Sequence, residues 1–142
     1  MLTDTKPDLP GDWTCDFNTG VGQWSLGGLW LDREGARLAV RVAERHCNAF
    51  GVMHGGAMAT FADAQALAVR SYSGEETDHT PTVSLSVDYL GGARFGTWLV
   101  ADVTLLRTTR ALIFTQALIT ADGKPVARSS AIYRNFQGKD AQ

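Results

Sequence analysis

Residues 47–69 place the strongest constraint on how this chain folds. The stretch reads CNAFGVMHGGAMATFADAQALAV and, its cysteine aside, holds only two ionisable side chains, His54 and Asp63. From the Gly-Gly pair onward it predicts one helix over residues 55–72, about 17 residues and roughly 25 Å long. A helix that is apolar on most of its circumference is buried, so the rest of the fold must cover it.

Alternating apolar and polar residues predict strands on both sides of this helix. Two precede it, near 28–32 and 38–42, and four follow it, at 82–90, 97–106, 111–121 and 125–135. The dipeptide Asp122-Gly123 is a strong hairpin signal between the last two. The order predicts an α+β fold in which an antiparallel β-sheet wraps around one long central helix. One sheet covers one side of a helix, so we expect a second copy of the chain to cover the rest.

Length and composition limit the classes of protein to which this chain can belong. The 142 residues favour a single domain, 1–142, with residues 1–20 as a loosely ordered N-terminal arm. A net charge of -2 gives no basic patch for nucleic acid, and no apolar run reaches the roughly 18–20 residues of a membrane span. The first 20 residues lack the apolar core of a signal peptide, and the two cysteines form no CxxC motif. We therefore expect a cytoplasmic protein with reduced thiols.

The two ionisable side chains of the buried stretch are candidates for chemistry. A carboxylate on a buried helix is costly unless it is paired or used, although Asp63 could instead lie on a solvated stripe. His54 lies nine residues earlier, on the opposite side of one helix, so the pair cannot ligate one metal ion. No other cluster has metal-ligand spacing, there is no G-x-S-x-G elbow, and Cys47 lacks a helix-start position. We expect no metal and no cofactor.

Gly55 and Gly56 open the predicted helix. Backbone N–H groups at a helix start point outward at the positive end of its dipole. Such a pair forms a natural oxyanion hole, and glycine lets a carbonyl approach closely. The alternative is that the two glycines only form a tight turn.

Together these residues match a known pattern. The stretch Asn48-x5-His54-Gly55-Gly56-x6-Asp63 resembles hotdog-fold thioesterases of the phenylacetate-degradation and 4-hydroxybenzoyl-CoA type. The resemblance continues through TVSLSVDYLGGARFG at 82–96 and ADGKPVARSSAIYR at 121–134. Relatives often have a Pro-containing turn where this chain has Gly91-Gly92.

The resemblance implies a site and its substrate. Asp63 would activate water, or attack directly, at the carbonyl of an acyl-CoA thioester, while the Gly55 N–H polarises that carbonyl. Asn48 and Thr82 would orient the thioester, the water or the carboxylate. In the family, the helix start of one subunit faces the Asp of its partner, which implies a homo-oligomer, a dimer or a dimer of dimers.

Further residues and a second function stay open. His54 is a candidate catalytic residue, and Gly56, Arg107, Thr109 and Arg110 are candidates for binding CoA, the arginines through its phosphates. A solvated turn explains the arginines equally well. The alternative to an enzyme is a non-catalytic acyl-CoA binding or sensing module, since one fold can serve both. A dehydratase of the same fold would need a His-Phe-Pro or Asp-x4-His signature, which is absent. The acyl group, aryl or medium-chain, is not identified.

Overall fold

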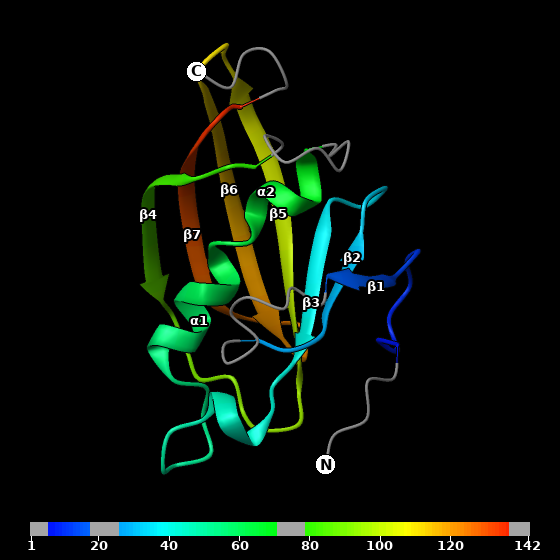
Figure 1. Cartoon of the computed structure of the whole chain (residues 1–142). Helices are drawn as coiled ribbons and strands as arrows, with labels where there is room; N and C mark the ends of the chain where they lie inside the picture. The colour runs from blue at the N-terminus through cyan, green and yellow to red at the C-terminus, as the bar shows by residue number, and fades with distance from the viewer. Residues whose placement is uncertain (1–5, 18–25, 71–78, 137–142) are drawn as a thin grey trace.

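The computed structural model describes residues 6–17, 26–70 and 79–136. Within them, one antiparallel sheet with the strand order β1-β2-β3-β5-β6-β7-β4 curves around two short helices (Figure 1). The strands are β1 Thr14–Phe17, β2 Leu29–Asp32, β3 Arg37–Arg41, β4 Thr82–Tyr89, β5 Trp98–Thr108, β6 Leu112–Ala121 and β7 Lys124–Arg134. The helices are α1 Gly55–Ala62 and α2 Gln65–Val69, and a 3-10 turn spans Glu44–His46.

The α+β class and the six expected strands are confirmed, each to within two residues at either end. The expected hairpin between β6 and β7 is also present. Asp122 and Gly123 have φ values of 50° and 76°, as a type I′ turn requires at both central positions.

Strand β1 was not expected from the sequence. It lies inside the segment 1–20, which we had expected to be loosely ordered, and it pairs with β2. Just before it, Trp13 is 4% exposed and packs with Ala39 and Val100 on the sheet face away from the helices. The Arg37 guanidinium covers the Trp13 ring at 4.7 Å from its centroid. The four residues of β1 show no clear alternation of apolar and polar side chains, so the strand could not be predicted from sequence. In the structure the buried Trp13 fixes the segment in place.

The prediction of one unbroken helix over 55–72 is wrong. Helix α1 ends at Ala62, α2 begins at Gln65, and Asp63 lies in the break. At this point the Ala64 N–H donates to the Phe61 carbonyl at 3.1 Å, which tightens the turn from the i→i−4 pattern to i→i−3. The Ala-rich sequence holds no local breaker, so the cause lies elsewhere in the fold. The expected end at Tyr72 lies outside the described residues.

The core lies between the concave face of the sheet and one face of the helices. Met58, Phe61 and Ala62 of α1 are buried in it, whereas Ala57 and Ala59 are only half-buried. Helix α1 is therefore covered on one side within a single chain. No helix in the described part of the chain is long and apolar enough to cross a membrane.

Candidate active site

Asp63 occupies the C-terminal cap of α1, where it is half-buried. Its Oδ1 accepts a hydrogen bond of 2.7 Å from the hydroxyl of Thr82, the first residue of β4. Burial raises the pKa of the Asp63 carboxyl above its ordinary value, and the Thr82 hydrogen bond partly opposes that rise. A carboxylate with a raised pKa is a better proton acceptor than an ordinary surface carboxylate.

The start of α1 offers one backbone donor rather than two. His54 is the N-cap, and its Nδ1 accepts the Gly56 N–H at 2.9 Å. This corrects the expectation that the Gly-Gly pair could serve as a two-donor oxyanion hole. No group among the described residues accepts the Gly55 N–H, which stays available to a ligand. His54 therefore acts within the chain as the cap of the helix.

Asn48 shapes the turn that leads into α1. It is exposed, and its Oδ1 accepts the N–H groups of Phe50 at 2.9 Å and Val52 at 3.4 Å. Its own N–H donates to the Val52 carbonyl at 2.9 Å. The turn thus uses the amide oxygen and leaves the side-chain N–H groups as the part of Asn48 that can reach a ligand.

Strand β4 runs beside α1 and contacts both of its ends. At one end Thr82 meets Asp63, and at the other the Tyr89 hydroxyl donates to the Gly55 carbonyl at 2.7 Å. The two ends of α1 are separated by about 12 Å at 1.5 Å per residue. One chain therefore keeps its Gly55 N–H and its own Asp63 carboxylate apart.

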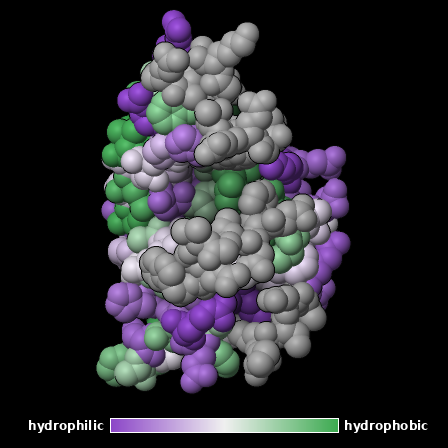
Figure 2. All heavy atoms as spheres, in the orientation of Figure 1, coloured by the Kyte–Doolittle hydropathy of each residue, from purple (hydrophilic) through white to green (hydrophobic). Residues whose placement is uncertain are grey.

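The same strand is an open edge of the sheet. Within the described ranges it pairs with β7 on one side only, and Val83 and Tyr89 are 53% and 55% exposed. Hydrophobic residues cluster at the left of the molecular surface in Figure 2, the side on which β4 lies in Figure 1. An exposed apolar edge strand is a ready template for pairing with another chain.

Residues 50–127 match the model of the Thioesterase superfamily, which is more than half of the 142-residue chain. The chain belongs to this superfamily. A protein of Pseudomonas aeruginosa named "Putative esterase PA0474" is 31% identical to this thioesterase superfamily member over 96 residues, covering 68% of this chain and 72% of that protein. Membership indicates thioester hydrolysis as the class of reaction.

Solved structures support the fold of this thioesterase superfamily member. A mutant of the phenylacetic acid degradation protein PaaI from Thermus thermophilus has a TM-score of 0.59 at 22% identity, over 70% of this chain and 84% of that one. A hypothetical thioesterase protein of Streptococcus pneumoniae, solved with coenzyme A, has a TM-score of 0.60 at 18% identity, over 71% and 78%. The hotdog fold that the sequence resemblance implied is confirmed.

Three of the residues expected to bind CoA lie away from Asp63 within one chain: Arg107, Thr109 and Arg110. Thr109 accepts the Leu112 N–H on its hydroxyl at 3.0 Å, so it closes the β5–β6 turn. That turn joins β6 and β5, which lie two and three strand spacings from Thr82 across the sheet, roughly 10–14 Å. Arg107 and Arg110 are exposed there. Their role in CoA binding stays a prediction.

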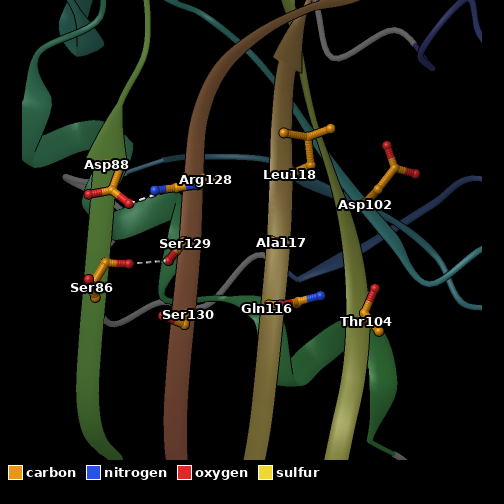
Figure 3. Close-up of a pocket in the computed structure, with 10 residues that line it drawn as sticks. All are labelled: Ser86, Asp88, Asp102, Thr104, Gln116, Ala117, Leu118, Arg128, Ser129 and Ser130. Carbon is orange, nitrogen blue, oxygen red and sulfur yellow. Dashed lines mark hydrogen bonds and ion pairs between the residues drawn. The ribbon is translucent and has the colours of Figure 1, made fainter.

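A hollow of about 580 Å³ on the other face of the sheet is separate from this site (Figure 3). Ser129 bonds to Gln65 on the helix side, so the next residue, Ser130, and its cross-strand partner Gln116 face away from the helices. The hollow and Asp63 therefore lie on opposite faces. No group of three or more His, Cys, Asp or Glu side chains in the described residues could hold a metal ion.

Three residues around the site were not among the predicted site residues. Tyr89 contacts the start of α1, while Gln65 and Tyr133 bond to the chain where α1 ends. Tyr89 stands at the end of an alternating strand, a position that gave no sign of its contact with a helix. Gln65, as a polar residue in an apolar stretch, was the one visible signal.

Proposed function

We propose that this thioesterase superfamily member hydrolyses acyl-CoA thioesters to the free acid and CoA. The observation that carries the proposal is the half-buried Asp63 carboxylate, held by Thr82 and given a raised pKa by burial. Asp63 takes a proton from water as the water oxygen attacks the thioester carbonyl carbon. The C–S bond then breaks, and the CoA sulfur leaves and takes up a proton. Direct attack by Asp63, followed by hydrolysis of the anhydride, is the other route.

The second part of the site is the oxyanion donor. The Gly55 N–H stabilises the negative charge that develops on the carbonyl oxygen, and the positive end of α1 adds to it. Asn48 orients the thioester through its side-chain N–H groups. A thioester is already activated, so a base and an oxyanion donor suffice without a cofactor. The CoA bound in the Streptococcus pneumoniae neighbour supports CoA esters as the substrate class.

We propose that each site is formed by two copies of the chain. Antiparallel pairing of β4 with the partner's β4 across a two-fold axis places the Thr82 end of one strand beside the Tyr89 end of the other. Thr82 is hydrogen-bonded to the Asp63 carboxylate, and Tyr89 is hydrogen-bonded to the Gly55 carbonyl. The pairing therefore brings each Asp63 toward the partner's Gly55 and covers the exposed edge.

A panel of aryl and medium-chain acyl-CoAs with free-thiol detection tests the reaction. We expect release of CoA with at least one class at enzyme concentrations far below that of the substrate. The competing function, a non-catalytic acyl-CoA binding module, predicts retention of the intact thioester. Saturable binding without thiol release for every ester tested would therefore overturn the proposal.

Replacement of Thr82 by valine is expected to shift the pH dependence of turnover. The hydroxyl stabilises the charged carboxylate and lowers its pKa, so its loss leaves the opposing effect of burial unchecked. The pKa of Asp63 then rises, and the acid limb of kcat/KM moves to higher pH. Thr104→Val, on an exposed position lining the hollow on the other face, is the matched control. An acid limb in Thr82→Val that coincides with that of the control would contradict this role.

A further inference from the structure

The break between α1 and α2 is built around a fully buried amide. Gln65 is 0% exposed, and its Nε2 donates to the Ala62 carbonyl and to the Ser129 hydroxyl, both at 3.0 Å. Its Oε1 accepts the Thr115 hydroxyl at 2.8 Å. Both amide N–H groups and the carbonyl oxygen are thus engaged, which holds the side chain in one orientation.

A second buried donor acts one residue further along. Tyr133 is 1% exposed, and its hydroxyl donates to the Asp63 carbonyl at 2.8 Å. In an unbroken helix these two carbonyls, of Ala62 and Asp63, would accept backbone N–H groups from the next turn. Here side chains from α2 and β7 bond to them. The donors therefore explain why α1 ends at Ala62, directly before Asp63, when its sequence could continue.

The same network reaches the strand that carries Thr82. The Ser129 hydroxyl, which accepts from Gln65, donates to the Ser86 carbonyl of β4 at 2.8 Å. The end of α1 is thereby tied to β6, β7 and β4 together.

The donors also change the electrostatics at Asp63. Carbonyl groups at a helix C-terminus form the negative end of the dipole and disfavour a nearby carboxylate. An N–H and an O–H aimed at the last carbonyls offset part of that potential. Among the described residues, Thr82 of β4 donates to the Asp63 carboxylate and Tyr133 of β7 donates to the Asp63 carbonyl. Burial raises the pKa of the carboxyl, and the Thr82 hydrogen bond lowers it.

We propose that Gln65 and Tyr133 are positioning residues for Asp63. Their donors end α1 at the catalytic carboxylate, aim it at Thr82, and reduce the negative potential of the helix end. The inference rests on the proposed function, in which Asp63 is the reacting carboxylate. A residue that only filled the core would contribute volume without donating to these carbonyls.

The test removes each donor while keeping the shape of the side chain. In the full-length protein, Gln65→Met and Tyr133→Phe are expected to lower kcat about tenfold with KM within about twofold, because a misplaced base weakens the reaction more than binding. The acid limb of kcat should move to higher pH. Ser129→Ala is the matched control, since it alters the network but leaves both donors to the helix-end carbonyls. It should retain the acid limb of the wild type.

A readout independent of turnover separates this inference from the proposed function. The titration of the Asp63 carboxyl carbon, followed by 13C NMR in protein labelled at aspartate, should have a higher midpoint in both donor variants and an unchanged midpoint in Ser129→Ala. Unmoved midpoints in the folded variants, or an equal shift in the control, would overturn the positioning role. Tyr133→Phe removes one oxygen atom and decides the question alone if Gln65→Met does not fold. Full activity of Asp63→Asn would refute the proposed function, whereas the titration midpoints would still report on positioning.

Discussion

Asp63→Asn is expected to abolish thioester hydrolysis while the chain keeps its fold and its assembly. The change removes the proton acceptor and the nucleophile together but keeps an oxygen that can accept the Thr82 hydroxyl. Loss of a positioned general base lowers kcat by about 10²–10⁴-fold. Steady-state kinetics with the best acyl-CoA measures the effect. Wild-type kcat in a variant free of contaminating enzyme would remove Asp63 from the mechanism.

The stability of this variant provides an independent check on the state of the carboxyl. Burial raises the folded-state pKa of Asp63 above its unfolded value, so ionisation disfavours the folded state. The free-energy cost of ionising Asp63 in the folded state is absent below the unfolded-state pKa of its carboxyl and complete above the folded-state pKa. At neutral pH we therefore expect Asp63→Asn to unfold at a temperature equal to or above that of the wild type. Asp102→Asn, an exposed carboxylate on the other face of the sheet, is the matched control for both kinetics and stability.

The strands could be predicted from sequence because their cause is local. In β4 to β7, the alternation of apolar and polar residues indicates which side chains face the core. The Asp122-Gly123 dipeptide indicates a hairpin turn because both residues readily adopt the positive φ that it requires. The helix break could not be predicted in this way. It depends on Gln65 and Tyr133 bonding to carbonyls, and the second of these residues lies 70 positions from Asp63 in the sequence.

The contacts of the candidate site also differ in whether a local sequence pattern could predict them. The resemblance predicted roles for Asp63 and Gly55 through a motif with fixed spacing, and in the structure Thr82 donates to the Asp63 carboxylate. The contact of Tyr89 with Gly55 joins residues far apart in the chain, which no local pattern records. The use of the Gly56 N–H by His54 is different, because the two residues are only two positions apart in the sequence.

Two inactive variants are expected to restore activity to one another if the site is shared between subunits. Asp63→Ala lacks the base, and Gly55→Pro lacks the N–H of the oxyanion donor, so each alone should be nearly inactive. The structure favours the proline variant as a clean probe. Gly55 is the first residue of α1, where proline is well tolerated, and His54 has φ -63° and ψ 141°, the extended geometry that proline requires of its predecessor.

The matched control for the proline variant is Gly55→Ala, which adds a side chain but keeps the N–H. A Cβ at this position would lie 3.5 Å from the Tyr89 ring, an ordinary contact, so Gly55→Ala should stay active. Light scattering first establishes that each variant is folded and at least dimeric. Activity in the mixture should then approach about a quarter of wild type, because random exchange makes half of the dimers mixed and each mixed dimer holds one intact site of two. Folded, verified heterodimers that remain inactive would place Gly55 and Asp63 of one site within one chain, and the pairing of β4 with the partner's β4 would then not assemble the active site.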